Sequence, residues 1–140
     1  MSKVKRKLTT ILATDCVGFS KRMDENEELT LENLKACRSI IDPQIKEFGG
    51  RIFYTAGDSV IAEFESPVEC VNAAIGFQKA INDRNNSIPQ ESRLDWRVGI
   101  HLDDVIIEGD NVYGNGVNIA ARLETCLLYT SPSPRDVRSS

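Results

Sequence analysis

The sequence predicts an α+β domain with a split βαβ, ferredoxin-like sheet and with its helices packed on one face. Short apolar runs rich in β-branched residues alternate with two long stretches of helical periodicity, in the order β-α-β-β-α-β. The chain has 140 residues, of which 41% are hydrophobic and 27% are charged. This length and composition are typical of one globular domain that can bury a core.

The first element is a strand over residues 8–14, where the chain is apolar and β-branched. It ends at Asp15, and Gly18, Phe19 and Ser20 then break the pattern. An Asp at this position is held at the end of the sheet rather than in its apolar face.

The first long helix should occupy residues 27–48, and Gly49-Gly50 supplies its stop signal. The apolar side chains at helical spacing, which we expect to be buried, are Leu31, Leu34, Ile41, Ile45 and Phe48. Pro43 interrupts the pattern. Either the helix kinks there, or a second helix begins with Asp42 as its cap.

Two short strands, over residues 51–55 and 60–64, are separated by four residues that are typical of a hairpin turn. Asp58 lies in or beside this turn. If Asp58 and Asp15 come close, their carboxylates repel each other unless a divalent cation, most readily Mg²⁺, neutralises them. The pair is therefore a candidate two-metal site for phosphoryl or nucleotidyl transfer. The alternative is two solvated turn or helix-capping residues.

The second helix should run over residues 67–82 with Ser66 as its cap. Its expected buried residues are Val68, Val71, Ala74, Ile75 and Ile81. A polar loop over 82–92, a strand over 93–101 and a short apolar run over 105–107 follow.

The last patterned segment, residues 116–124, is a good helix opening. Its apolar side chains are Val117, Ala120, Ala121 and Leu123. From Thr125 the periodicity is lost and two Ser-Pro steps appear. We therefore expect a domain over residues 1–124 and a disordered or non-native tail over 125–140.

The charge and cysteine content exclude several classes of protein. A formal net charge of -4 and a pI near 5.1 argue against a general nucleic-acid binder. No apolar stretch approaches the roughly 18–20 residues that span a bilayer, so we expect no direct membrane contact and a cytoplasmic location. With only one histidine, His101, a zinc site is not expected, and the cysteines should be buried thiols. They are Cys16, Cys37, Cys70 and Cys126.

Three motifs follow one another along the chain. They are Asp-x-x-Gly-Phe-Ser from Asp15, Gly-Gly-x-x-x-x-x-Ala-Gly-Asp ending at Asp58, and Tyr-Gly-Asn-Gly-Val-Asn-Ile-Ala-Ala-Arg ending at Arg122. In this order, across residues 7–124, they resemble the class III adenylate/guanylate cyclase catalytic domain, which has a palm-type sheet.

The resemblance implies a site and a reaction. Asp15 and Asp58 would bind two Mg²⁺ or Mn²⁺ ions, Asn118 would orient the ribose, and Arg122 would stabilise charge on the reacting phosphate. The phosphates would be cradled by the backbone amides of Val17, Gly18, Phe19 and Ser20. The implied reaction converts ATP to 3′,5′-cyclic AMP and pyrophosphate for intracellular signal transduction, at an interface between two protomers. We accordingly expect a homodimer in the complete domain.

The sequence departs from the family at the two positions that select the base. In the family that the chain resembles, adenylate cyclases have a Lys and an Asp at these positions, and guanylate cyclases have a Glu and a Cys. This chain has Tyr54 and Asn111 instead. Both side chains can hydrogen-bond a base, so these two positions leave the choice between adenine and guanine open. The resemblance implies ATP as the favoured substrate. Nothing after Glu124 matches the rest of the family's domain.

Two alternatives to an adenylate cyclase remain. One is a catalytically weak or inactive cyclase-like module that binds nucleotide or dimerises to regulate a partner. The other is a different palm-like nucleotidyl transferase, related to polymerases or diguanylate cyclases. The absence of a Gly-Gly-Asp/Glu-Glu-Phe loop counts against this second alternative.

Overall fold

The computed structural model describes residues 5–108, 111–113 and 128–129. In this part of the chain, a strand, two helices, two strands, a third helix, a 3-10 turn and three strands follow in order. Their bounds are β1 Lys5–Cys16, α1 Phe19–Glu25, α2 Glu27–Glu47, β2 Arg51–Ala56, β3 Ser59–Phe64, α3 Pro67–Asn86, η1 Gln90–Ser92, β4 Trp96–Glu108, β5 Asn111–Tyr113 and β6 Leu128–Tyr129.

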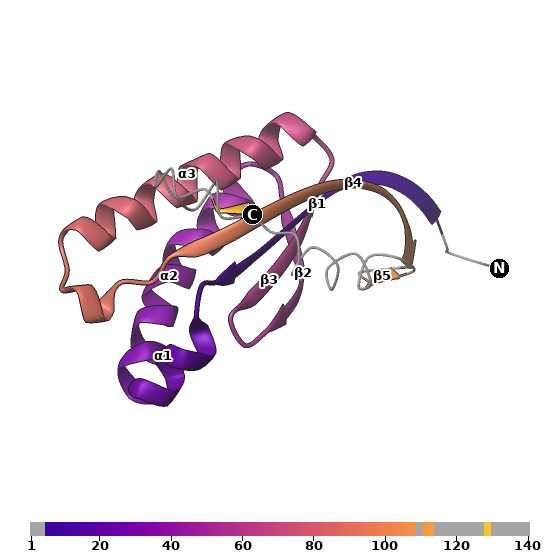
Figure 1. The fold of residues 1–140 in the computed structure, drawn as a ribbon. Helices are drawn as coiled ribbons and strands as arrows, with labels where there is room; N and C mark the ends of the chain where they lie inside the picture. Colours follow the sequence, from indigo (N-terminus) through magenta and orange to yellow (C-terminus); the bar gives the residue numbers. More distant parts are fainter. Residues whose placement is uncertain (1–4, 109–110, 114–127, 130–140) are drawn as a thin grey trace.

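The strands form one antiparallel sheet in the order β2-β3-β1-β4-β5, and β6 also pairs with β4. The central strand is β1, which pairs with β4 over its whole length, from Lys5 opposite Ile107 to Cys16 opposite Trp96. β4 is long and arched (Figure 1). The first strand of the chain therefore lies at the middle of the sheet.

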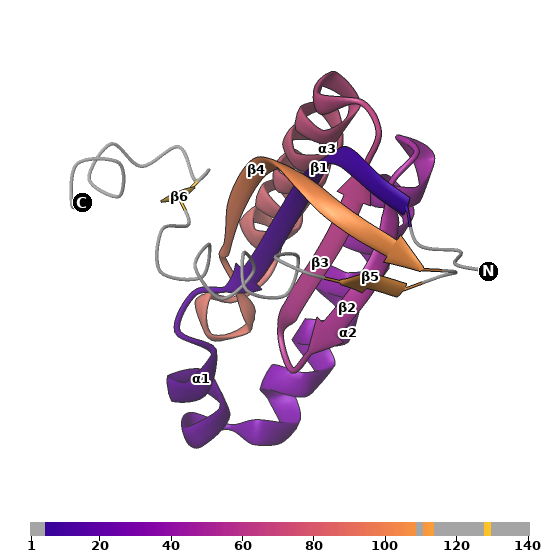
Figure 2. The same ribbon diagram turned by 90° about the vertical axis from the view of Figure 1, so that its right-hand side faces the viewer.

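The two long helices, α2 and α3, pack on the same face of this sheet, as Figures 1 and 2 show from two sides. Between helices and sheet lies a core that includes Leu12, Leu34, Cys37, Ile41, Ile45, Val60, Ala62, Phe64, Cys70, Ala73, Phe77, Ile81, Leu94, Trp96 and Val98. This arrangement confirms the predicted α+β fold class with helices on one face. Cys16, Cys37 and Cys70 are buried free thiols, as expected, and Cys126 lies outside the described residues.

The helix α2 runs through Pro43 without interruption, so a second helix starting there is a wrong alternative. Asp42 is not a cap, because its carboxylate accepts two hydrogen bonds from Arg38 at 2.8 and 2.9 Å. Pro43 removes the helical donor for the carbonyl of Ser39. Both residues are exposed, so water can satisfy that carbonyl.

Several elements differ from the prediction. The short helix α1 was not expected, since Gly18 looked like a simple break; it is in fact the cap residue of α1, at φ 65°. α3 extends to Asn86, and the two apolar runs after it join into the single strand β4. Asp103 and Asp104 do not interrupt β4, because they pair with residues of β1.

The predicted buried faces of the helices are partly wrong. Leu31 of α2 is 37% exposed, and on α3 Val68, Val71 and Ile75 are 67%, 43% and 61% exposed. The stripe of α3 that faces the sheet consists of Cys70, Ala73, Ala74, Phe77 and Ile81. Small side chains at three of these positions allow α3 to lie close to the sheet, so the bulkier valines point elsewhere.

After β5, the structure describes only residues 128–129. Leu128–Tyr129 forms β6 within the expected tail, and the domain boundary at residue 124 stays a prediction. Within residues 5–108, 111–113 and 128–129, no helix combines the length and apolarity that crossing a membrane requires.

Candidate active site

Asp15 and Asp58 come together at one end of the sheet. Asp15 is the next-to-last residue of β1, and Asp58 lies in the turn between β2 and β3. β3 pairs with β1, Thr14 lying opposite Val60, so the turn reaches the end of β1. There Oδ2 of Asp58 accepts a hydrogen bond from the backbone N–H of Cys16 at 2.8 Å. The Asp58 carboxylate is thus hydrogen-bonded to Cys16, the residue that follows Asp15.

Asp15 is nearly buried, with 6% of its surface exposed, and its charge is paired. Arg97 of β4 lies directly opposite in the strand register. Its Nε donates to Oδ1 of Asp15 at 2.9 Å and its Nη2 donates to Oδ2 at 3.1 Å. Sequence reasoning missed Arg97. The only signal that could have revealed it is the antiparallel register of two strands about 80 residues apart.

Cys16 lies between these carboxylates and stays a neutral thiol. Burial is the main cause that raises its pKa to about 12, and the negative charge of Asp58 is the next largest. Asp15 also raises the pKa of this thiol, so the charges of both carboxylates reach the same sulfur. At neutral pH the site therefore offers carboxylate oxygens and not a thiolate.

The turn after β1, assigned by resemblance to phosphate binding, joins the site to α1. Gly18 has a left-handed φ of 65°, a conformation that glycine adopts without strain. The N–H of Val17 already donates to the carbonyl of Asp95 at 2.8 Å, so this amide is engaged within the protein. The amides of Phe19 and Ser20 begin α1, where N–H groups have no helical acceptor. A hollow of about 600 Å³ adjoins the turn, lined in part by Val17, Gly18 and Lys21.

The remaining predicted residues are not brought together by the described part of the chain. Tyr54 is 41% exposed on β2, and Asn111 begins β5; these are the outer strands of the five-strand path. Asn118 and Arg122 lie outside the described residues. The roles of all four stay predictions.

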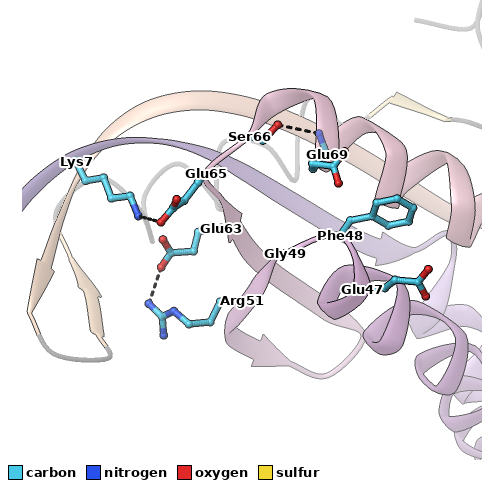
Figure 3. Close-up of a pocket in the computed structure, with 9 residues that line it drawn as sticks. All are labelled: Lys7, Glu47, Phe48, Gly49, Arg51, Glu63, Glu65, Ser66 and Glu69. Atoms are coloured by element: carbon cyan, nitrogen blue, oxygen red, sulfur yellow. Dashed lines mark hydrogen bonds and ion pairs between the residues drawn. The ribbon is translucent and has the colours of Figure 1, made fainter.

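A second hollow, of about 550 Å³, lies at the opposite end of β1 and β3. Figure 3 shows Glu65 facing Lys7 and Glu63 facing Arg51 across it, and both are ion pairs. Its carboxylates also include Glu47 and Glu69. Because this hollow is a full strand length from Asp15, it is separate from the candidate site.

The donor set at Asp15 and Asp58 fits a hard divalent cation. Mg²⁺ is usually held by one or two carboxylates together with substrate phosphates, rather than by a complete protein cage. Residues 5–108, with the short stretches 111–113 and 128–129, contain no group of three or more His, Cys, Asp or Glu side chains placed to hold a metal ion.

Comparison with known proteins gives a consistent result. The family model described as "Adenylate and Guanylate cyclase catalytic domain" matches residues 2–128. A protein of Rhizobium meliloti (strain 1021) named "Putative adenylate cyclase 3" is 37% identical over 122 residues, which are 86% of this chain. The chain spans 21% of that relative's length.

Two solved structures are also similar. The adenylate/guanylate cyclase/hydrolase from Silicibacter pomeroyi has a TM-score of 0.78 and 36% identity, over 89% of this chain and 73% of its own. The adenylyl cyclase CyaB from P. aeruginosa has a TM-score of 0.74 over 91% and 76% of the two chains, and its 24% identity supports the fold alone.

Proposed function

Because this chain belongs to the adenylate and guanylate cyclase catalytic domain family, we propose that it converts ATP to 3′,5′-cyclic AMP and pyrophosphate in cyclic nucleotide signalling. The observation that carries the proposal is the hydrogen bond from the Cys16 amide to Asp58, which brings the second carboxylate beside Asp15. Asp58 thereby reaches the residue next to Asp15, at the end of a sheet of this family's fold. This contact supports the assignment of the two aspartates to one site.

Asp15 and Asp58 would hold two divalent ions, Mg²⁺ or Mn²⁺, as the family generally does. The ions would supply charge neutralisation for attack of the ribose 3′-oxygen on the α-phosphorus. Asp15 would be positioned by its place in β1, and Asp58 by the hydrogen bond from the amide of Cys16. Such preorganisation lowers the cost of assembling the site.

The nucleotide would be bound by residues assigned through the resemblance. Backbone amides of the turn Val17, Gly18, Phe19 and Ser20 would contact phosphates, with the Val17 amide the least available of them. Asn118 and Arg122 would act on the ribose and the reacting phosphate, and Tyr54 and Asn111 would contact the base. The complete domain would act as a cytoplasmic homodimer, with each site shared between protomers.

A second candidate is a cyclase-like module that binds nucleotide, or dimerises, without appreciable turnover. It is favoured by Tyr54 and Asn111, which replace the residue pairs of both adenylate and guanylate cyclases. The intact pair of Asp15 and Asp58 favours the enzyme instead.

Isothermal calorimetry of the 140-residue chain tests the proposal. A non-hydrolysable ATP analogue is titrated with Mn²⁺ present and absent, with a GTP analogue in parallel, and cyclic AMP formation from ATP is assayed on the same protein. The expected result is metal-dependent binding of the ATP analogue that Asp58→Asn abolishes. Binding without any product would favour the module, and binding unaffected by Asp58→Asn would contradict the assigned site.

A further inference from the structure

We propose that Phe53 is a second base-contacting residue, whose ring stacks on the purine of the nucleotide beside Tyr54. The inference rests on the proposed function, because Tyr54 is assigned to the base through the family resemblance. It goes further by adding an aromatic side chain at a position that the sequence motifs leave unspecified. An irregularity in strand β2 carries the argument.

The pairing of β2 with β3 shifts by one residue at Phe53. Ile52 lies opposite Ala62. Two residues further along β2, Tyr54 lies opposite Ile61, which is only one residue away from Ala62. Two residues of β2 thus stand against one residue of β3, which is the definition of a β-bulge. Phe53 does not have a positive φ, so this bulge is not of the type that requires glycine.

The bulge turns Tyr54 to the face of the sheet that lies away from α2 and α3 (Figures 1 and 2). Ala62 belongs to the core beneath these helices, and Ile52 packs against the same core. In a regular strand, Tyr54 would return to the face of Ile52, since side chains two residues apart share a face. Opposite Ile61, Tyr54 lies on the other face instead, because Ile61 and Ala62 are adjacent in β3 and point to opposite faces.

Asp15 lies on this same face. Ala13 of β1 is opposite Ile61, and Asp15 follows it two residues later in the strand. The side chains of Ala13 and Asp15 therefore point to one face of the sheet. A proposed metal ligand and a proposed base contact thus share this face, although they belong to different strands. Without the bulge they would lie on opposite faces.

Phe53 is brought to the same face as Tyr54. It directly follows Ile52, whose side chain packs against the core, so alternation along the strand places Phe53 on the opposite face. In agreement, Phe53 is not among the partly buried residues that pack against that core. Phe53 is half-buried and Tyr54 is 41% exposed. The two rings form an aromatic pair that a ligand can reach.

An aromatic pair of this kind suits a purine. Stacking on Phe53 would add affinity without reading the edge of the base, because every base has a π-face. The hydroxyl of Tyr54 can instead form a hydrogen bond with the edge. Phe53 would therefore contribute equally to the binding of adenine and guanine nucleotides. The alternative role of Phe53 is to cover the sheet without touching a ligand.

The first test compares the full chain with Phe53→Leu, which keeps an apolar side chain and loses the ring. Calorimetry with Mn²⁺ measures binding of non-hydrolysable ATP and GTP analogues and of inorganic tripolyphosphate, which has no base. We expect Phe53→Leu to bind both analogues about fivefold more weakly, the lower end of base–aromatic stacking, and tripolyphosphate as the wild type does. The matched control Phe48→Leu removes a half-buried ring on the helix side of the sheet and should change none of these affinities.

A second test retains an aromatic ring and reports its contact directly. Phe53→Trp should restore the affinity that Phe53→Leu loses, because an indole also stacks on a base. Its additional fluorescence should be quenched by the ATP analogue and not by tripolyphosphate. The wild type supplies the background of Trp96, which is 1% exposed. Emission of Phe53→Trp that the ATP analogue leaves unchanged would overturn the inference.

The outcomes separate this inference from the proposed function. Nucleotide binding that Asp58→Asn abolishes and Phe53→Leu leaves unchanged would keep the proposed site and remove Phe53 from it. Equal weakening of the two analogues and of tripolyphosphate in Phe53→Leu would indicate a general disturbance of the fold and would also overturn the role of Phe53. No binding of either analogue by the wild type would overturn both proposals.

Discussion

Two substitutions at Asp58 should separate its structural role from its proposed metal-binding role. Asp58 is half-buried and accepts the Cys16 amide at 2.8 Å, next to a residue whose side chain is buried. Asp58→Ala removes the acceptor and leaves this amide without a partner, which costs about 1–3 kcal/mol. Asp58→Asn keeps a carbonyl oxygen at the same place, so only the extra strength due to charge is lost, about half of the interaction.

The assay is thermal unfolding followed by circular dichroism in the presence of a chelator, with Mn²⁺ calorimetry on the same samples. For a chain of this size a loss of 1 kcal/mol lowers Tm by about 2–4 °C. Asp58→Ala should therefore unfold roughly 2–12 °C below the wild type, and Asp58→Asn at most half as far below it. Both should lose Mn²⁺ binding. If Asp58→Ala were as stable as the wild type, the hydrogen bond from the Cys16 amide would not hold the turn in place, and the reasoning would fail.

Three further predictions concern the glycines, the thiols and Tyr54, which we propose to contact the base. Gly50→Ala should destabilise the protein by about 1–3 kcal/mol in urea titrations, because its Cβ would lie 2.5 Å from a core phenylalanine ring. Gly76→Ala, in the middle of α3, should instead be neutral or stabilising by up to about 1 kcal/mol, because its Cβ meets only a flexible glutamine side chain. Equal effects of Gly50→Ala and Gly76→Ala on the free energy of unfolding would contradict this difference in packing. Burial raises the pKa of both Cys16 and Cys70 from 9.0 to about 12, so in the unfolded chain these thiols ionise first. The stability contributed by the two thiols is complete below pH 9.0 and is lost as the pH rises toward 12. In urea titrations at several pH values, the free energy of unfolding of Cys70→Ala should therefore fall less steeply with pH than that of the wild type. Equal slopes for the two proteins would argue against a raised pKa of Cys70. Tyr54→Phe should weaken binding of the ATP analogue by roughly three- to tenfold in calorimetry, the worth of one neutral hydrogen bond, and unchanged affinity would remove Tyr54 from the base site.

The order of elements could be predicted from the sequence because apolar periodicity reports the local environment of each segment. The faces of the helices could not be predicted as well. α3 carries two apolar stripes, and hydrophobicity alone favoured the one with Val68, Val71 and Ile75. The sheet instead receives the stripe with Cys70 and Ala73, since close approach depends on small side chains.

The candidate site was predictable to the extent that it lies at strand ends. Asp15 and Asp58 each stand at the end of an apolar run, and the motifs identified them as a pair. Arg97 was not predictable, because its partner is set by the pairing of β1 with β4, a contact across 82 residues. Local patterns hold no information on which side chains a distant strand will present.

The central position of β1 has a consequence for synthesis of the protein. β1 is made before both of its neighbours in the sheet, β3 on one side and β4 on the other. The partner of Asp15 lies 82 residues later, a wait of roughly 4–16 s at ribosomal rates of about 5–20 residues per second. During that interval the apolar run from Ile11 to Ala13 has an open strand edge. This run is the segment that a chaperone, or another nascent chain, would encounter before the domain is complete.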